Sequence, residues 1–304
     1  MKTVFVVNPA SGNASTGRRW DEISGRILGL GVEHEALMTH APGDATALAA
    51  RAIAEGADTV VAVGGDGTIN EVANGFFADG LDASRAALGL LPMGTGGDFR
   101  RTVGIPAELE GAIALLRARS LRAIDVGRIE MRGLDGAPLV RHFVNIADSG
   151  IGGVVVERVN RTSKMLGGRV SFQYAAMMTL LSYRPQAVVV ERAEGRFEGL
   201  AQNVVVANGQ YFGGSMHVAP RAVPDDGVFD VVVFGDIARL EALRSINDIY
   251  SAKHLLNPKV TTWQSAEVRV SSEERVLVDV DGEMCGTLPA VFSVVPKAIP
   301  LVVP

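Results

Sequence analysis

The chain has 304 residues, of which 47% are hydrophobic and 21% are charged, and this composition excludes a disordered, collagen-like or low-complexity protein. Its 29 basic and 34 acidic residues give a net charge of -5, so we expect no nucleic-acid partner, because nonspecific binding to nucleic acid needs a basic surface. The only cysteine, Cys285, cannot form an internal disulfide, which indicates a reducing compartment.

The hydrophobic stretches are too short for a secretion signal or a membrane span. Asn8 and Pro9 interrupt the apolar run at the start of the chain. The longest stretch without Asp, Glu, Lys or Arg, residues 199–220, contains glutamine, asparagine and four glycines. We therefore expect a cytoplasmic protein, and peripheral association with the inner face of the membrane stays open.

The first third of the chain alternates short β-branched runs with helical patterns, which predicts a parallel sheet covered by helices. We expect strands at residues 3–7, 33–38, 59–63 and 87–91, and helices at residues 18–30, 44–55 and 69–77.

After about residue 120, strand patterns outnumber helical ones, which predicts a largely antiparallel β-sandwich. We expect strands at residues 122–131, 142–147, 187–192, 203–207 and 228–234, and helices at residues 170–183 and 237–250. The predicted fold class is therefore α/β, with a parallel, helix-covered domain over residues 1–120 followed by a β-rich domain over residues 121–296. The tail at 297–304 is expected to pack back on the first domain.

Three glycine-rich segments each follow a predicted strand: residues 8–12 (NPASG), 64–67 (GGDG) and 91–99 (LPMGTGGDF). Glycine lets the backbone approach a ligand closely, and amides at a following helix start favour phosphate oxygens. A tight turn also explains a glycine pair, but a turn does not need the polar residues Asp66 and Thr68. Because loops at the carboxyl ends of strands converge in an open α/β sheet, the three segments together predict a nucleotide or phosphate site.

Two carboxylate segments in the second half have two interpretations each. Asp281-Gly282-Glu283 between apolar strands is typical of a hairpin turn, although a carboxylate there could accept a hydroxyl proton. Asp226, with nearby backbone carbonyls, could bind Mg²⁺, whereas a solvated turn is the simpler interpretation.

Six segments together resemble the bacterial diacylglycerol kinases and related lipid kinases, a family that includes the sphingosine and ceramide kinases. These segments are NPASG, THAPGDAT, VGGDGTINEV and LPMGTGGDF in the first half, and residues 207–234 and 278–286 in the second. The resemblance therefore extends over nearly the whole chain. It implies an ATP-dependent lipid kinase that transfers the γ-phosphate to a hydroxyl of diacylglycerol or a related glycerolipid or sphingolipid.

The resemblance assigns ATP binding to residues 1–120 and the lipid substrate to residues 121–296. By matching motifs, the ATP contacts fall on Asn8, Ser11, Gly12, Thr39, Gly64, Gly65, Asp66, Gly67, Thr68, Ile69, Asn70 and Thr95. Thr39, taken from the sequence alone, is simply the end of a strand.

The resemblance also implies catalytic and metal-binding residues. It places the general base at Asp281 or Glu283 without deciding between them, and Asp66 is a further catalytic candidate for contacting a metal or the acceptor. A structural Mg²⁺ is expected on the following residues: Asp226 through its side chain, and Val223 and Val228 through their carbonyls.

Two features depart from the family pattern. Gly97 occupies a position where the family often has asparagine, so one amide side chain is missing. Arg100 replaces a frequent alanine, and with Arg101 it could meet phosphate or anionic lipid, or form a solvated helix face.

Two alternative functions stay open: an NAD kinase-like enzyme, and a non-catalytic nucleotide- or lipid-binding protein. The sequence also leaves homodimer formation open. If the substrate is a lipid, we expect the membrane surface as a partner, contacted by basic residues beside the apolar stretch 170–183, for which core packing is the alternative. The basic candidates are Arg158, Arg161, Lys164 and Arg169.

Overall fold

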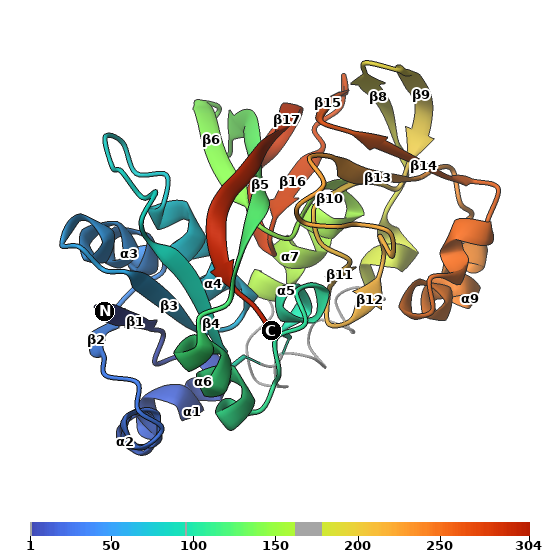
Figure 1. Ribbon diagram of the computed structural model, residues 1–304. Helices are drawn as coiled ribbons and strands as arrows, with labels where there is room; N and C mark the ends of the chain where they lie inside the picture. Colours follow the sequence, from blue (N-terminus) through green and yellow to red (C-terminus); the bar gives the residue numbers. More distant parts are fainter. Residues whose placement is uncertain (1, 95, 162–177) are drawn as a thin grey trace. The chain divides into compact units, whose positions relative to one another are not determined.

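The computed structural model describes residues 2–94, 96–161 and 178–304, with the side chains of 159–161 excluded. Its contacts divide the chain into two compact units, Met1–Asp125 with Lys297–Pro304, and Val126–Pro296 (Figure 1). The first unit contains a parallel sheet with helices, and the second is dominated by antiparallel strands. This arrangement confirms the predicted fold class.

Parallel strands form the centre of the first unit, in the order β2-β1-β3-β4. Their bounds are β1 (Thr3–Val7), β2 (Glu35–Met38), β3 (Thr59–Gly64) and β4 (Ala87–Pro92). Every residue of β1 and β3 is buried, as expected for strands covered on both faces. The end of β17 (Glu283–Val302) extends this sheet, because Leu301 pairs with Leu88 in parallel.

Helices and the C-terminal tail complete the first unit. The helices are α1 (Ser11–Arg18), α2 (Trp20–Gly29), α3 (Asp44–Ala54), α4 (Asp66–Gly75), α5 (Asp98–Thr102) and α6 (Leu109–Ala118). Ile23 and Ile27 of α2 and Ile113 of α6 pack with Phe5 in one core. The helix α4 begins at Asp66, three residues before the predicted start, because the extended backbone of Gly65 ends the turn there.

The second unit has the strand order β14-β13-β10-β7-β16-β17, and neighbouring strands along this path run antiparallel. The main strands are β7 (Ile146–Gly150), β10 (Asn203–Ala207), β13 (Phe229–Phe234), β14 (Val260–Ser265) and β16 (Leu277–Val280). The other strands are β5 (Leu121–Gly133), β6 (Pro138–Phe143), β8 (Gln186–Arg192), β9 (Gly195–Ala201), β11 (Tyr211–Phe212), β12 (Met216–His217) and β15 (Glu267–Ser271). Phe143 stacks on Phe229 within the core, with ring centroids 5.5 Å apart.

Two predictions for the second unit need correction or cannot be followed. The single strand predicted at 142–147 is two strands, β6 and β7, because the intervening amides of Val144 and Asn145 bond to a carboxylate instead of continuing a ladder. The helices are α7 (Ile151–Arg161), α9 (Arg239–Tyr250) and the short η2 (Lys253–Leu256). Of the helix predicted at 170–183, residues 178–182 are helical, and residues 170–177 lie outside the described residues.

Among the described residues, no helix has the length and apolar character needed to cross a membrane.

Two helical glycines provide a matched test of packing in the first unit. A Cβ on buried Gly75 of α4 would lie 2.6 Å from the Ala49 Cβ and 2.7 Å from the Thr46 carbonyl oxygen of α3, whereas a Cβ on Gly25 would have nothing within 4 Å. We expect Gly75→Ala to lower the free energy of unfolding by about 1–3 kcal/mol. Gly25→Ala should raise it by about 0.5–1 kcal/mol, because alanine favours a helix more than glycine does. Urea unfolding of both variants measures this, and equal stabilities would contradict the close packing of α3 on α4.

Candidate functional site

The three glycine-rich loops meet at the carboxyl ends of β1, β3 and β4. The side-chain amide of Asn8, after β1, donates to the Thr68 hydroxyl in α4 at 3.1 Å. A Cβ on Gly94, after β4, would lie 2.6 Å from the Cα of Gly65, after β3. The backbones of these two loops are therefore in contact, and a side chain at Gly94 would push them apart.

Gly12 brings the first loop to the third. Its φ is +58°, in the left-handed region, and a Cβ there would lie 2.8 Å from the Met93 carbonyl oxygen. The Ser11 hydroxyl donates to the Asn8 carbonyl at 2.9 Å and lies 2.7 Å from the Thr16 hydroxyl, so hydrogen bonds within the first loop fix its shape.

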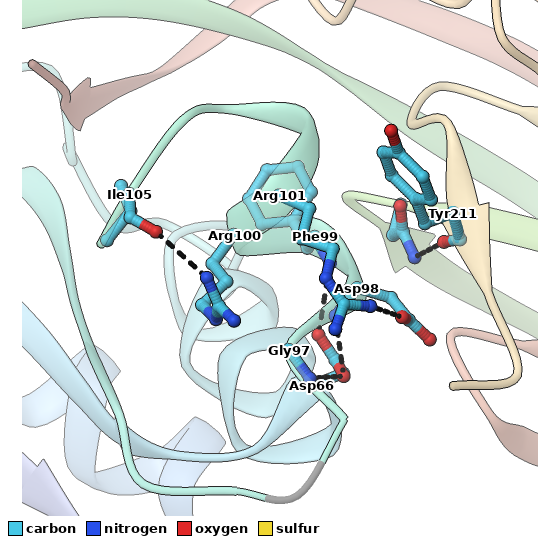
Figure 2. Close-up of polar contacts among 9 residues, drawn as sticks. Asp66, Gly97, Asp98, Phe99, Arg100, Arg101, Ile105 and Tyr211 are labelled. Carbon is cyan, nitrogen blue, oxygen red and sulfur yellow. Dashed lines mark hydrogen bonds and ion pairs between the residues drawn. The ribbon is translucent and has the colours of Figure 1, made fainter. Parts of the chain in front are cut away.

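Asp66 fastens the third loop to the start of α4. One carboxylate oxygen accepts the amides of Gly97 at 2.9 Å and Asp98 at 3.2 Å, and the other accepts the amide of Phe99 at 3.2 Å (Figure 2). Both oxygens are thus engaged by consecutive backbone amides. The geometry gives Asp66 a positioning role in the loop, and its predicted role in catalysis stays a prediction.

Gly97 is suited to this turn by its backbone. Its φ is +71°, a conformation that glycine adopts freely and that asparagine tolerates better than other residues. A Cβ there would lie 2.6 Å from the Nε atom of Arg100 and 3.1 Å from its Cδ atom. The departure from the family's asparagine therefore keeps the backbone conformation that delivers the Gly97 amide to Asp66.

The arginines that follow are both held by neighbouring groups. Arg100 donates to the carbonyl of Ile105 at 3.2 Å, and Arg101 forms an ion pair with Asp98 at 3.1 Å (Figure 2). In this arrangement the two guanidinium groups brace α5 and the segment after it.

The other predicted ATP residues differ in accessibility. Thr39 lies beside the first loop, because its amide donates to the Val7 carbonyl at 2.9 Å. Ile69 and Asn70 are 1% and 0% exposed, so their side chains support α4 from inside. Gly64 is buried, and Gly65 to Gly67 are partly exposed at the helix start. Thr95 lies outside the described residues.

Asp281, in the second unit, accepts three consecutive backbone amides. Its carboxylate oxygens bond to the amides of Val144 at 2.9 Å, Asn145 at 3.1 Å and Ile146 at 2.8 Å. The residue is 8% exposed, and its φ of +50° turns the chain directly into Gly282. Asp281 therefore joins the β16 end to the start of β7.

Glu283 has a different environment from Asp281. Its carboxylate forms an ion pair with Arg141 at 3.1 Å, and its side chain is 39% exposed. Of the two predicted bases, Glu283 is the one that a substrate can reach more easily. Sequence reasoning missed Arg141, because 142 residues separate it from Glu283 and no local pattern marks it.

The segment predicted to bind Mg²⁺ is a surface turn whose candidate metal ligands are oxygen atoms, from the Asp226 carboxylate and from backbone carbonyls. The exposed Asp226 accepts the Val228 amide at 3.1 Å, and the Val223 carbonyl accepts the Asp225 amide at 2.9 Å. No group of three or more His, Cys, Asp or Glu side chains in the described part of the chain could hold a metal. A metal at Asp226 would therefore rely on backbone carbonyls and water, which fits Mg²⁺, a cation that prefers oxygen and keeps several waters.

The predicted membrane-binding residues can be followed only in part. Arg158 of α7 donates to the Ser182 hydroxyl at 3.4 Å, and the nearby side chains of Met178 and Leu181 are 37% and 44% exposed. The Arg161 side chain, Lys164 and Arg169 lie outside the described residues.

Comparison with known proteins identifies both halves of the chain. Residues 2–129 match the diacylglycerol kinase catalytic domain, and residues 145–303 match the YegS C-terminal NAD kinase beta sandwich-like domain. A diacylglycerol kinase of Bacillus subtilis (strain 168) is 30% identical over 302 residues, which cover 99% of this chain and 95% of that protein. A diacylglycerol kinase of Staphylococcus saprophyticus is 29% identical, over 95% of this chain and 90% of that protein.

The fold is shared with a protein of Bacillus anthracis strain Sterne. Its crystal structure gives a TM-score of 0.77 at 24% identity, over 100% of this chain and 97% of that one. With the matches above, these findings confirm the resemblance that the sequence motifs indicated. The chain belongs to the diacylglycerol kinase family, and it is a lipid kinase, a phosphotransferase that uses an alcohol group as acceptor.

Proposed function

We propose that this chain transfers the γ-phosphate of ATP to a hydroxyl of diacylglycerol or a closely related lipid. The observation that carries the proposal is the Asp66 carboxylate, which draws the Gly97–Phe99 amides to the start of α4 and so brings two glycine loops together. Relatives over almost the full length of the chain are named diacylglycerol kinases, which supports this acceptor.

The loop edge of the first unit has the properties of a phosphate site. The first amides of a helix have no partner within the helix and carry its positive dipole end, so the start of α4, at Asp66 to Thr68, favours phosphate oxygens. The close backbones at Gly65 and Gly94 leave no side chain between the loops. Asn8 and Ser11 add polar groups from the first loop. We assign ATP binding to this edge.

We assign the general base to Glu283 and a positioning role to Asp281. Phosphoryl transfer to an alcohol needs a carboxylate that can accept the hydroxyl proton. Asp281 uses its oxygens to hold three amides and is 8% exposed, whereas the Glu283 side chain is 39% exposed and forms an ion pair with Arg141. The Arg141 guanidinium would keep the Glu283 carboxylate oriented until it meets the hydroxyl.

The assay that decides the activity uses purified protein, labelled ATP, Mg²⁺ and lipid vesicles. We expect labelled phosphate on diacylglycerol, with monoacylglycerol, phosphatidylglycerol, ceramide and sphingosine as competing acceptors. Phosphorylation of NAD in place of every lipid would make the chain an NAD kinase, and ATP binding without any transfer would make it a non-catalytic binder.

Because the proposed acceptor lies in a bilayer, the protein should also sediment reversibly with anionic vesicles, less so at high salt.

Substitutions at the two carboxylates distinguish the general base, Glu283, from the positioning residue, Asp281. We expect Glu283→Gln to lower kcat by about 10²- to 10⁴-fold and to leave ATP affinity and thermal stability nearly unchanged, because the side chain is partly exposed. Asp281→Asn should lower the melting temperature, since hydrogen bonds to a charged group contribute about 1.5–3 kcal/mol each. If Asp281→Asn keeps the wild-type melting temperature without activity while Glu283→Gln stays active, the two roles are reversed.

We propose a structural Mg²⁺ at Asp226, Val223 and Val228, where it would supply charge neutralisation within a surface turn. A metal that binds only the folded state raises its stability by mass action. Titrating Mg²⁺ without ATP should therefore raise the melting temperature of the wild type but not of Asp226→Ala. Asp225→Ala is the matched control and should keep the increase. An identical response from Asp226→Ala and the wild type would show that the segment is a plain turn.

A further inference from the structure

Two aspartates lie opposite each other on neighbouring strands in the interior of the second unit. Asp148 of β7 and Asp279 of β16 are direct partners in an antiparallel pair, which puts their side chains on the same face with Cβ atoms about 5 Å apart. They are 1% and 7% exposed. The established activity and the proposed ATP, base and metal sites use neither residue.

The neighbours of Asp148 leave it in a closed environment. Its carboxyl oxygens lie against Gly152 in the first turn of α7, where a Cβ would collide with them. The side-chain amide of Asn203, on β10, is oriented so that its nitrogen faces acceptors. It donates to the Asp148 carboxyl and to the Ser149 carbonyl, both at 3.0 Å. A negative charge on Asp148 is thus stabilised by the positive end of the α7 helix dipole and by the side-chain amide of Asn203.

Asp279 lacks comparable compensation. The Gly282 amide bonds to its carboxyl group, but one carboxyl oxygen, Oδ1, is buried and has no hydrogen-bond partner among the described residues. A buried acceptor without a donor is unfavourable, and it is more so beside a second carboxylate.

The other titratable groups around the pair add negative charge or are already paired. Asp281 and Glu283 both act on Asp279, and the uncharged acids Tyr183 and Cys285 interact with Asp148 and Asp279, respectively. On β6, Arg141 pairs with Glu283, and burial and two arginines lower the pKa of His142 to about 4, so that ring is neutral. The described charges on α7 are Glu157 and Arg158, and Arg158 bonds to Ser182.

Burial acts on both carboxyls in the same direction. It raises the pKa of Asp148 to about 7, and burial together with the charge of Asp148 raises the pKa of Asp279 well above its ordinary value. Ionising both carboxyl groups of a buried pair is costly, because two negative charges would then lie side by side. The pair therefore loses one proton first and keeps the other until a much higher pH.

We propose that Asp148 and Asp279 share one proton at neutral pH, and that this proton holds β7 to β16 beneath the Asp281–Glu283 turn. The proton supplies the donor that the unpartnered Asp279 oxygen lacks, and Asp148 keeps the single charge beside α7. The two aspartates are then positioning residues, because Asp281 follows Asp279 by two residues and is itself bonded to the start of β7. This last step rests on the proposed function, whereas the shared proton does not.

The sign of the pH effect follows from proton linkage. A carboxyl whose pKa is raised by folding binds more proton in the folded state than in the unfolded chain, where Asp has a pKa of about 3.9. The unfolding equilibrium constant should therefore rise with pH, by about tenfold per pH unit for one extra bound proton, from about pH 4 towards pH 7. The rise should end only at the alkaline pH where the pair loses its shared proton, and the destabilisation then stays constant.

Infrared spectroscopy tests the shared proton without any activity assay. At neutral pH the wild type should show the carbonyl band of a protonated carboxyl group, and Asp148→Asn or Asp279→Asn should remove it, because the new amide donates in place of the proton. Asp230 is the matched control, a buried carboxyl on β13 whose pKa burial also raises. Asp230→Asn should leave the band from the pair intact. A wild-type spectrum without the band, or a band that only Asp230→Asn removes, would overturn the proposal.

Stability measured against pH gives the second readout. Relative to the wild type, Asp148→Asn and Asp279→Asn should become progressively more stable as pH rises from 5 to 7, by up to about tenfold per pH unit in the unfolding constant. Asp236→Asn, which removes an exposed carboxylate from the same unit, should show no such trend.

The positioning role predicts that kcat of the wild type falls at alkaline pH more steeply than that of Asp279→Asn. Parallel stability curves for wild type and both pair variants would refute the shared proton, and parallel kcat profiles would refute the positioning role alone.

Discussion

A single carboxylate that accepts three consecutive backbone amides is the interaction on which the loop edge of the first unit depends. Without Asp66, the Gly97–Phe99 segment would have no fixed relation to α4, and the backbone contact between Gly65 and Gly94 would lose its restraint. The parallel sheet brings the loops to one edge because its strands all end there. The Asp66 carboxylate then sets their spacing, and the proposed binding of phosphate would need that spacing kept to about 0.5 Å.

The second unit uses the same device in another context. Asp281 collects the amides of Val144 to Ile146, about 136 residues away, as Asp66 collects those of Gly97 to Phe99 about 32 residues away. In both motifs a glycine follows the aspartate, and the carboxylate accepts backbone amides from a segment that is distant in the sequence. Aspartates followed by glycine therefore hold loops in both units, whereas the neighbouring Glu283 side chain remains partly exposed.

The sequence predicted the fold class and the site loops because both depend on local patterns. Buried apolar runs followed by glycine-rich segments identified β1, β3 and β4, and the start of α4 was misplaced because Gly65 is extended. The break between β6 and β7 could not be predicted, since it results from bonds to Asp281 far along the chain. For the same reason, the Arg141–Glu283 pair and the opposed Asp148 and Asp279 appear only once the strand register is known.

Backbone amide exchange combined with ATP binding tests the central role of Asp66 most directly. In Asp66→Asn, the amides of Gly97 to Phe99 should exchange faster than in the wild type, and the affinity for Mg²⁺-ATP should fall with them. Asp58→Asn is the control, because Asp58 also accepts a backbone amide, from Lys2 at 2.7 Å, but at the start of β3 and away from the loops. That variant should bind ATP like the wild type. Faster exchange at Gly97 to Phe99 with undiminished ATP affinity would contradict the account.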